Sequence, residues 1–546
     1  MKVLASILLI VILFVSSQAQ WANPSPVRGQ FGQMTSAKLN SIPDFVLPAI
    51  YSDRTAHPLP AVVNHETDAV AKPYMPPVNW CIDGWCCSNA SGTSFSYDYA
   101  VQTYYKITSA SAGSSPLMTY NYTYHFMNSA NQSTGGDGWM YVESFDILKA
   151  TGGLTSTDFG GFDGAVDQTN AWSSGYDKYY RAMKLRVNEY YKIDPGTTAG
   201  DNMIKQVVYD YADGSPAGAI LSFQANSESM PTSTVSGRKV LTGLGGGGGH
   251  ALSICGYDDN FNGGSWLCQA HWGTGDYWLP YSMLHSGAPW YNNPSGNNHV
   301  MFCRIKKDYT PKFTFKVTVT ESQRNQICLM VGAANSTTAT QPSVSKDFGN
   351  AFNYGGGSIP MCGSGKSSTM EIGFDLTDFA SVVSGGQGTF FLKVLSKGGS
   401  GQVNSLALED YNGASVREIA CSQTNVNITS STVLSVPWTG SVSTEIEQQK
   451  TLASHQGNGL SATMSPSSKT VQFSFPGNAM RSATLQIKNV SGRTVLTKAC
   501  QSAGTASWDM KDYFGRSVSS GTYIASVNAT GVDGAVRELS TKVLVK

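Results

Sequence analysis

The pattern of hydrophobic and polar residues divides the middle of the chain into helices followed by strands. Residues 94–107 carry apolar groups at helical spacing and only two charged residues, which predicts a helix buried on most sides. Helices are also predicted near 141–149 and 202–212, and apolar runs predict strands at 219–223, 251–256, 265–269 and 300–304. Helices first and strands later indicate an α+β domain over residues 75–306.

After this region the pattern alternates with a period of two. Residues 312–445 contain strand-like runs separated by Gly- and Ser-rich turns, which is typical of an antiparallel β-sandwich. A polar stretch at 446–471 is predicted to be a linker. Residues 472–546 alternate again and predict a second all-β domain of immunoglobulin-like type. The expected fold is therefore an α+β domain followed by two all-β domains.

The N-terminus predicts export. Lys2 precedes an almost unbroken apolar run from Val3 to Val15, and Ser17-Gln18-Ala19 has the small-x-small pattern of a signal peptidase site. We expect residues 1–19 to be a signal peptide, with a single N-terminal anchor as the alternative. Residues 20–74 are Pro-rich and weakly patterned, so we expect an extended leader or a prosegment. No further run is long and apolar enough to span a membrane, so we expect no transmembrane segment in the mature chain.

Charge and cysteine usage narrow the possible partners. Lys plus Arg equals Asp plus Glu at 37 each, and this balance gives no reason to expect nucleic acid or anionic lipid. Ten cysteines in an exported chain permit disulfides. Cys255, Cys268 and Cys303 lie in apolar runs and are expected to be buried thiols. No cysteine or histidine spacing indicates a metal site, so neither metal nor cofactor is expected.

The most informative stretch runs from Gly245 to Tyr281. Five glycines precede His250-Ala-Leu-Ser-Ile-Cys-Gly-Tyr-Asp-Asp, and Trp272-Gly273 follow after a short interval. This block resembles the papain family of cysteine peptidases, and the resemblance extends in order over residues 75–306. It implies a papain-like fold in which His250 is the general base.

Two positions of this block depart from the family pattern. In this register the Asn that orients the imidazole is replaced by Ala270, and the following Ser by His271. Alanine can neither orient the ring nor stabilise imidazolium. Loss of the orienting group costs about 10⁴-fold in rate in a serine peptidase. His271 does not replace it, because neighbouring side chains on a strand point to opposite faces.

The nucleophile region departs further. In the best register Ser94 stands at the family's catalytic Cys, which opens a buried helix, and Ser88 stands at the Gln that donates to the oxyanion. An alternative register puts Cys86 or Cys87 at the nucleophile position. Against it, residues 89–92 (Asn-Ala-Ser-Gly) look like a poor continuation of a buried helix.

The C-terminal region carries a second resemblance. Its Ser491-Gly492-Arg493, Trp508-Asp509 and Ser520-Gly521-Thr522-Tyr523 are similar to the FlgD-type immunoglobulin-like domains used for sorting in type IX secretion. The resemblance implies a bacterial protein that crosses the outer membrane through contact of this domain with the secretion machinery. The mature chain would be secreted or attached to the cell surface.

Together these observations lead us to expect a secreted papain-like pseudopeptidase whose cleft binds a peptide, protein or glycan. The substitutions at Ser94, Ser88 and Ala270 motivate this hypothesis. The first alternative is an active peptidase that uses Ser94, Cys86 or Cys87 with His250. The second is a structural or adhesive surface protein in which the β domains carry the function.

Overall fold

The chain forms two compact units, Met1–Val442 and Ser443–Lys546. The computed structural model describes residues 36–48, 51, 58–76, 86–108, 118–127, 141–160, 170–195, 197–211, 217–225, 231–243, 250–269, 276–285, 299–349, 351–353, 357–442, 461–465, 470–474, 480–489, 494–500, 505–511, 518, 521–531 and 536–545.

The first unit begins with an α+β part. Its helices are α2 (Ser36–Ser41), η3 (Lys72–Tyr74), α3 (Cys87–Asn89), η4 (Ala90–Tyr97), α4 (Asp98–Tyr105), α6 (Tyr120–Met127), α7 (Tyr141–Thr151), α8 (Ser156–Phe159), α9 (Tyr176–Met183), α10 (Thr198–Tyr209) and α11 (Tyr281–His285). Its strands are β1 (Val62–Asn64), β2 (Val187–Ile193), β3 (Leu221–Ala225), β4 (Thr232–Val235), β5 (Arg238–Leu241), β6 (His250–Asp258), β7 (Ser265–Gln269), β8 (Tyr277–Pro280) and β9 (Val300–Ile305). They form one sheet in the order β2-β9-β3-β6-β7-β8-β5-β4, and β1 also pairs with β6.

Strand β6 lies in the middle of this sheet because its sequence is apolar on both faces. Every residue of β6 is buried. Leu252 and Ile254 pack with Ile204 of α10, whereas Ala251 packs with Cys87 of α3 on the other side. A near-continuous apolar run is typical of a strand covered on both faces. The helix predicted from 94–107 and the strands predicted at 251–256, 265–269 and 300–304 are confirmed, with shifted ends.

Parts of the predicted leader pack on this domain. Phe45 is buried, and its backbone nitrogen donates to Lys192 O of β2 at 2.9 Å. Strand β1 pairs antiparallel with the far end of β6, with Val63 opposite Tyr257. Residues 36–48 and 58–76 therefore contribute buried side chains and a strand to the α+β fold.

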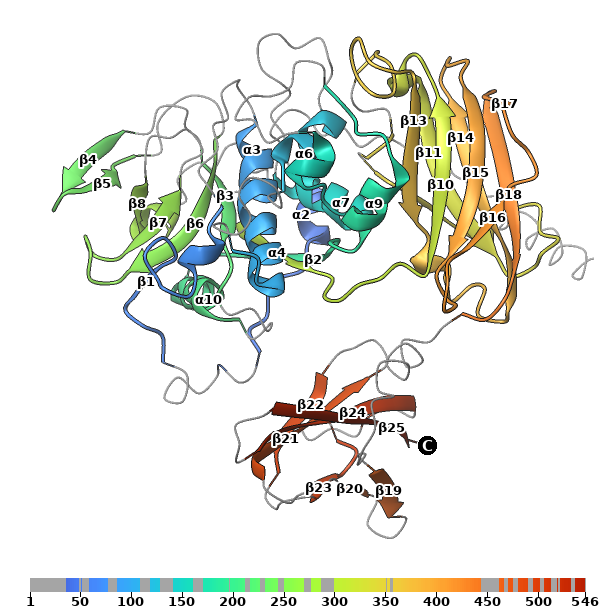
Figure 1. Cartoon of the computed structure of the whole chain (residues 1–546). Coiled ribbons are helices and arrows are strands. Elements are labelled where there is room, and N and C mark those ends of the chain that lie inside the picture. The colour runs from blue at the N-terminus through green and yellow to red at the C-terminus, as the bar shows by residue number, and fades with distance from the viewer. Residues whose placement is uncertain are drawn as a thin grey trace, which may run out of the picture. The chain divides into compact units, whose positions relative to one another are not determined.

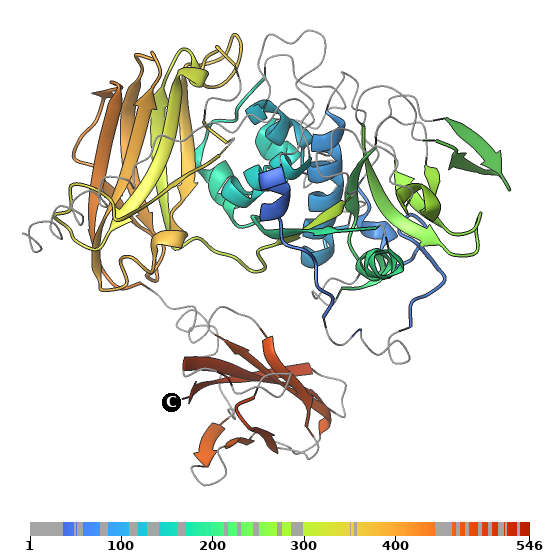
Figure 2. The same ribbon diagram turned by 180° about the vertical axis from the view of Figure 1, so that it is seen from behind.

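The rest of the first unit is an antiparallel sandwich of two sheets. One sheet has the order β13-β10-β15-β16 with β17 beside β15, and the other has β12-β11-β14-β18. The strands are β10 (Phe313–Thr320), β11 (Ile327–Ala334), β12 (Val344–Asp347), β13 (Thr369–Asp375), β14 (Gln387–Ser396), β15 (Gln402–Asp410), β16 (Arg417–Ala420), β17 (Val426–Asn427) and β18 (Ser431–Thr439). In Figures 1 and 2 helices α6, α7 and α9 lie between this sandwich and the sheet that contains β6.

The sandwich and the helices share one hydrophobic core. The rings of Phe126 of α6 and Trp172 both meet that of Phe352 edge-on, and Phe352 also contacts Phe374 on β13. At Gly373 an added Cβ would lie 2.9 Å from Tyr179 Cβ of α9, so the absence of a side chain permits this close approach. The sequence predicted the sandwich strands, and the structure adds that their core extends into the preceding helices.

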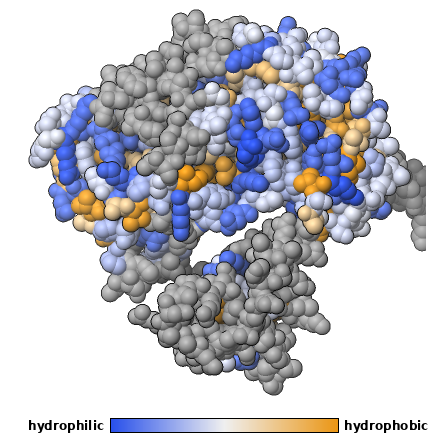
Figure 3. Space-filling model, viewed as in Figure 1, coloured by the Kyte–Doolittle hydropathy of each residue, from blue (hydrophilic) through white to orange (hydrophobic). Residues whose placement is uncertain are grey.

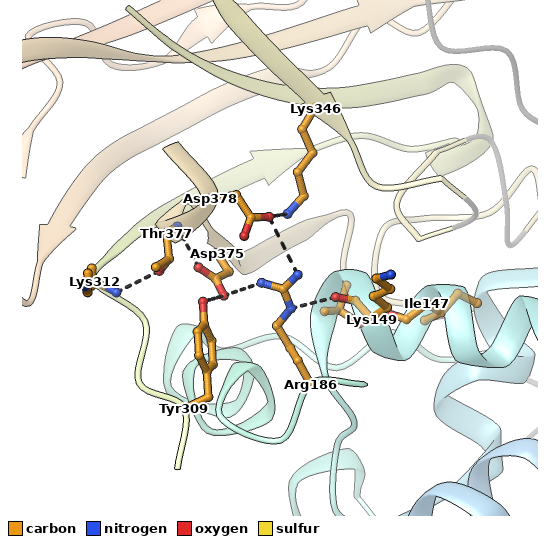
Figure 4. A network of polar contacts seen from close by, with 10 residues as sticks. Ile147, Lys149, Arg186, Tyr309, Lys312, Lys346, Asp375, Thr377 and Asp378 are labelled. Atoms are coloured by element: carbon orange, nitrogen blue, oxygen red, sulfur yellow. Dashed lines mark hydrogen bonds and ion pairs between the residues drawn. The ribbon is translucent and has the colours of Figure 1, made fainter. Parts of the chain in front are cut away.

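A buried polar network joins the same two parts (Figure 4). Arg186 forms an ion pair with Asp375 at 2.7 Å, and both side chains are almost fully buried. Its Nε donates to Lys149 O at the end of α7 at 2.7 Å. Tyr309 OH donates to the same carboxylate of Asp375 at 2.6 Å. The charges of Arg186 and Asp375 can be buried because they pair with each other and each makes a further hydrogen bond.

The second unit is a β-sandwich. One sheet contains β19 (Ser461–Ser465), β20 (Thr470–Ser474) and β23 (Thr505–Trp508), and the other contains β22 (Thr494–Ala499), β21 (Met480–Asn489), β24 (Gly521–Gly531) and β25 (Val536–Val545). Trp508 is buried between the sheets and meets the ring of Tyr523 edge-on at 5.2 Å. Strand β19 lies within the stretch predicted as a linker at 446–471, so this unit starts before residue 472.

The exposed surface gives little indication of a docking site. On the face shown in Figure 3 the hydrophobic residues of the described part lie in small, separate areas. The large exposed hydrophobic side chains, such as Val46, Tyr209 and Val416, are scattered over the first unit. Among the described residues, no helix has the length and apolar character needed to cross a membrane.

Candidate active site

The helix that carries the predicted nucleophile begins at Cys87. Helix α3 continues through the π-helical turns of η4 into α4, so residues 87–105 form one unbroken helix. Cys86 precedes the first turn and is disulfide-bonded. Ser94 was expected to open the helix, but it lies in the middle of η4 instead.

Residues 89–92 are a good continuation of this buried helix, contrary to the sequence-based expectation. The Nδ2 atom of Asn89 donates to Thr123 Oγ1 at 3.2 Å and to Ser144 Oγ at 3.0 Å. Ser91 Oγ donates to Leu252 O of β6 at 2.9 Å. Buried polar side chains cost little when they are hydrogen-bonded, and here the partners come from α6, α7 and β6.

The hydroxyl of Ser94 is bonded to the segment before α6. Its Oγ atom donates to Met118 O at 3.1 Å, and the side chain is 1% exposed. The backbone nitrogen of Met118 in turn donates to Asp98 Oδ1 at 3.0 Å. These contacts fix the helix to the segment before α6. The contacts of Ser94 therefore do not bring it together with His250.

The structure brings Cys87 to the beginning of β6. The backbone nitrogen of Ala251 donates to Cys87 Sγ at 3.4 Å. Ala251 directly follows His250, which is the first residue of β6 and pairs with Ala225 of β3. Cys87 is a reduced thiol at the first position of a long helix. A thiol at a helix N-terminus therefore lies against the backbone at the start of the strand whose first residue is His250.

The environment of His250 keeps its imidazole neutral in the absence of an adjacent charge. The side chain is 1% exposed, and burial lowers its pKa to about 4, since the imidazolium would lose its hydration. A neutral imidazole can accept a proton and is the form that a general base needs. A thiolate nearby would oppose this effect, because an opposite charge favours imidazolium.

Cys87 is itself buried, which disfavours its thiolate, but two features of the site act in the other direction. The N-terminus of a helix carries a partial positive charge, which lowers the pKa of a cysteine thiol. The N–H of Ala251 also points at the sulfur, and a hydrogen bond to the charged form stabilises it. Neither feature would do much for a serine hydroxyl, whose pKa is far higher.

The remaining predicted positions give a mixed picture. Ser88 is the second residue of α3, directly after Cys87, and its buried hydroxyl makes no hydrogen bond in the part of the chain that the structure describes. Ala270 and His271 lie outside the described residues, as does the glycine run at 245–249. Strand β7 ends at Gln269, one residue before Ala270.

No metal site is evident within the described ranges, where no three His, Cys, Asp or Glu side chains gather as possible ligands. Cys255, Cys268 and Cys303 are buried thiols, as predicted. Burial raises the pKa of Cys255 and Cys268, which makes both unreactive as nucleophiles.

Sequence reasoning gave Cys87 only as an alternative and did not single out Glu66. Two adjacent cysteines directly before a run of small residues were the available signal for Cys87. Glu66 lies in the predicted leader, and its carboxylate accepts from Gln269 Nε2 at 3.3 Å. No sequence pattern predicts this contact, because the two residues are 203 positions apart.

Comparisons with known proteins find distant likenesses only among solved structures. No family model and no curated protein matches the chain. Procathepsin B of Trypanosoma congolense is 13% identical with a TM-score of 0.31, covering 51% of this chain and 87% of that chain. A digestive procathepsin L2 from the larval midgut of Tenebrio molitor is 14% identical with a TM-score of 0.29, covering 50% and 83%. PorZ, a surface component of the type IX secretion system of Porphyromonas gingivalis, is 13% identical with a TM-score of 0.13, covering 26% and 22%.

Proposed function

We propose that this chain is an exported papain-like thiol peptidase in which Cys87 is the nucleophile and His250 the general base. The observation that carries the proposal is the hydrogen bond from Ala251 N to Cys87 Sγ, which puts the thiol beside the residue that follows His250. The resemblance of the His250 block to the papain family supports the same assignment.

The proposed reaction follows from these two groups. His250 takes the proton of the Cys87 thiol, and the thiolate attacks the carbonyl carbon of a peptide bond. The imidazolium then gives its proton to the leaving amine as the C–N bond breaks, which leaves a thioester on Cys87. Water then attacks the thioester with His250 again as the base. The carboxylic acid product is released and the Cys87 thiol is restored.

The hypothesis of a pseudopeptidase depends on Ser94 at the nucleophile position. The hydrogen bond of Ser94 to Met118 O gives this hydroxyl a structural role, and the position of Cys87 at the start of β6 makes it the better candidate nucleophile. Ala270 still stands where the family has its orienting Asn. We therefore propose a slow peptidase, because an unoriented imidazole lowers the rate.

Peptide hydrolysis by the purified full-length chain tests the proposal. A library of fluorogenic peptides is offered to the wild type and to the Cys87→Ala, His250→Ala and Ser94→Ala variants. We expect the first two variants to lose about 10³-fold or more in kcat/KM. Ser94→Ala is the matched control and should keep the wild-type kcat/KM.

Three other outcomes contradict the proposal. Activity that disappears in Ser94→Ala and persists in Cys87→Ala would assign the nucleophile to Ser94. A wild type that binds peptides but never cleaves them would support the pseudopeptidase. A wild type that neither binds nor cleaves peptides would favour a structural or adhesive surface protein.

We further propose that the second unit directs export across the outer membrane of a bacterium. The FlgD-type resemblance of its sequence supports this assignment, as does its immunoglobulin-like sandwich around Trp508 and Tyr523. Deletion of residues 461–546 should leave the first unit inside the cell envelope, whereas the full chain reaches the medium or the cell surface. Equal export of both chains would contradict this role.

A further inference from the structure

Strands β7 and β8 are held together at one end by a residue of the predicted leader. The two strands are antiparallel, with Cys268 opposite Tyr277, so Gln269 and Asp276 lie next to each other across the ladder. Glu66 contacts both residues. Its Oε1 atom accepts from Gln269 Nε2 at 3.3 Å, and its carboxyl group lies close enough to that of Asp276 for Asp276 to raise the pKa of Glu66.

The turn that presents Glu66 is fixed to the body of the domain. The backbone nitrogen of Glu66 donates to Asn64 Oδ1 at 2.8 Å, which closes a local turn directly after β1. The backbone nitrogen of His65 donates to Cys255 O of β6 at 3.1 Å. Glu66 is thus placed by the side chain of Asn64 and by the bond of the preceding residue to β6.

The ring of His65 adds two more anchors on other elements. It stacks on Tyr99 of α4 at a centroid distance of 5.1 Å and an interplanar angle of 11°. Its Nε2 atom lies 2.8 Å from Val208 O of α10. The segment before Glu66 is therefore attached to the nucleophile helix, to β6 and to α10 at once.

This arrangement connects Glu66 to the catalytic pair. Gln269 lies opposite Ser253 in the β6–β7 ladder, and β6 begins with His250. Ala270, at the position of the family's orienting Asn, follows Gln269 directly. A group that fixes the end of β7 therefore acts on the strand that pairs with β6 close to His250.

We propose that Glu66 is a positioning residue for the Cys87–His250 reaction, which it supports by tying the ends of β7 and β8 to the turn after β1. This inference rests on the proposed peptidase function. It also implies that the active chain keeps residues 58–76, although they belong to the region predicted as a leader.

The chemistry of the contact predicts a dependence on pH. Two carboxyl groups form a hydrogen bond only while one of them keeps a proton, and burial together with Asp276 raises the pKa of Glu66 to about 8. The thiol of Cys255 on β6 also faces Glu66, and that of Cys268 on β7 faces Asp276. Burial raises the pKa of both thiols, so they stay neutral in this range. Above about pH 8 two carboxylates would face each other, and the tie would open.

Four variants of the full-length chain test the proposal. Glu66→Ala removes the contact of Glu66 with Gln269 and Asp276. Glu66→Gln replaces the carboxyl group of residue 66 with an amide that can donate a hydrogen bond but does not titrate. Asp276→Asn makes the same replacement at residue 276. Thr67→Ala is the matched control, because Thr67 is the exposed neighbour of Glu66. For each variant kcat, KM and the rate of Cys87 alkylation by iodoacetamide are measured between pH 5 and 10.

We expect Glu66→Ala to lower kcat by about 10-fold to 100-fold, as displacement of a catalytic group does, with KM and the folded fraction little changed. Glu66→Gln should keep the wild-type kcat at pH 7 and lose the decline centred near pH 8, and Thr67→Ala should match the wild type. The active, alkylated species should have an N-terminus before residue 58.

The outcomes separate this inference from the proposed function. A wild type without turnover and without selective alkylation of Cys87 would remove the peptidase function itself. An active wild type whose kcat and pH profile are unchanged by Glu66→Ala would overturn only the role of Glu66. Full activity in a chain that begins after residue 66 would overturn it as well.

Discussion

The Sγ atom of Cys87 lies 3.4 Å from the backbone nitrogen of Ala251, which donates a hydrogen bond to it. The two residues are 164 positions apart, and their contact joins the start of a helix to the start of the central strand β6. Because Ala251 follows His250, this contact defines the candidate active site. The predictions below test its chemistry and the fold that supports it.

The titration of His250 should depend on Cys87. Burial lowers the pKa of His250 to about 4, and a neighbouring thiolate raises it again. We expect His250 in the Cys87→Ala variant to remain neutral down to about pH 4, and to titrate at a higher pH in the wild type. Nitrogen-15 NMR of the imidazole measures both. Identical pKa values in the two proteins would show that thiolate and imidazole do not interact.

The Ser94→Ala variant should lose stability without losing activity. It leaves Met118 O, a buried acceptor, without the hydroxyl at 3.1 Å, and an unsatisfied buried group costs about 1–3 kcal/mol. Denaturant unfolding followed by tryptophan fluorescence measures the change. A Ser94→Ala protein with unchanged stability and no activity would reverse the roles assigned to Ser94 and Cys87.

Deprotonation of Asp98 should lower the stability of the folded protein as the pH rises. The side chain is fully buried in α4, and burial raises its pKa to about 7, against an ordinary value of 3.8. The protonated form is favoured in the folded state, so its stabilising effect is complete below about pH 4 and is lost as the pH rises through 7. The free energy of unfolding of the wild type should fall by a few kcal/mol relative to that of Asp98→Asn between pH 4 and 8.

Parallel denaturation curves of the two proteins measure this difference. His65 and His250 have lowered pKa values and change stability in the opposite direction below pH 6.5, but they do so equally in both proteins. A difference between wild type and Asp98→Asn that stays constant with pH would contradict the assignment.

The sandwich and the helical part should unfold together. Gly373 on β13 touches Met183 and Tyr179 of α9, where a Cβ would come within 2.9 Å of each. Replacing Gly373 with Leu should therefore force the two parts away from each other and cost about 1–3 kcal/mol or more. Calorimetry of residues 20–442 should show one transition in the wild type. The exposed Gly385→Ala variant, where nothing lies within 4 Å of an added Cβ, is the control.

Removal of the buried ion pair is a second test of whether the sandwich and the helical part unfold together. Arg186→Met leaves Asp375 charged and buried without its partner, which costs about 3–5 kcal/mol. The double variant Arg186→Met/Asp375→Leu removes both charges and should recover much of this loss. Two separate transitions in the wild type, with only one of them affected by these variants, would show that the two parts fold independently.

The sequence was most informative where the pattern of apolar residues within one element predicts that element. The apolar residues of β6 predicted a strand, which the structure buries on both faces, and the alternation of β10 and β15 predicted the sandwich strands. These patterns are local, so no knowledge of the partner elements was needed.

The start of the active-site helix could not be predicted in this way. Asn89, Ser91 and Thr93 look unfavourable for a buried helix until their partners on α6, α7 and β6 are known. Alignment to a family motif then favoured Ser94, because a motif contains no information on these long-range hydrogen bonds. The contact of Glu66 with Gln269 could not be predicted either, because it is also a long-range contact.

The most direct test of the proposed active site is the reactivity of Cys87 in the full-length chain. Wild type and His250→Ala are treated with iodoacetamide at several pH values, and each modified cysteine is identified by peptide mass spectrometry. We predict that Cys87 alone among the reduced cysteines of the described residues reacts rapidly at pH 6–7, and that His250→Ala slows it by at least about 10-fold. A Cys87 that reacts no faster than the other buried thiols, or equally fast in both proteins, would contradict the proposed active site.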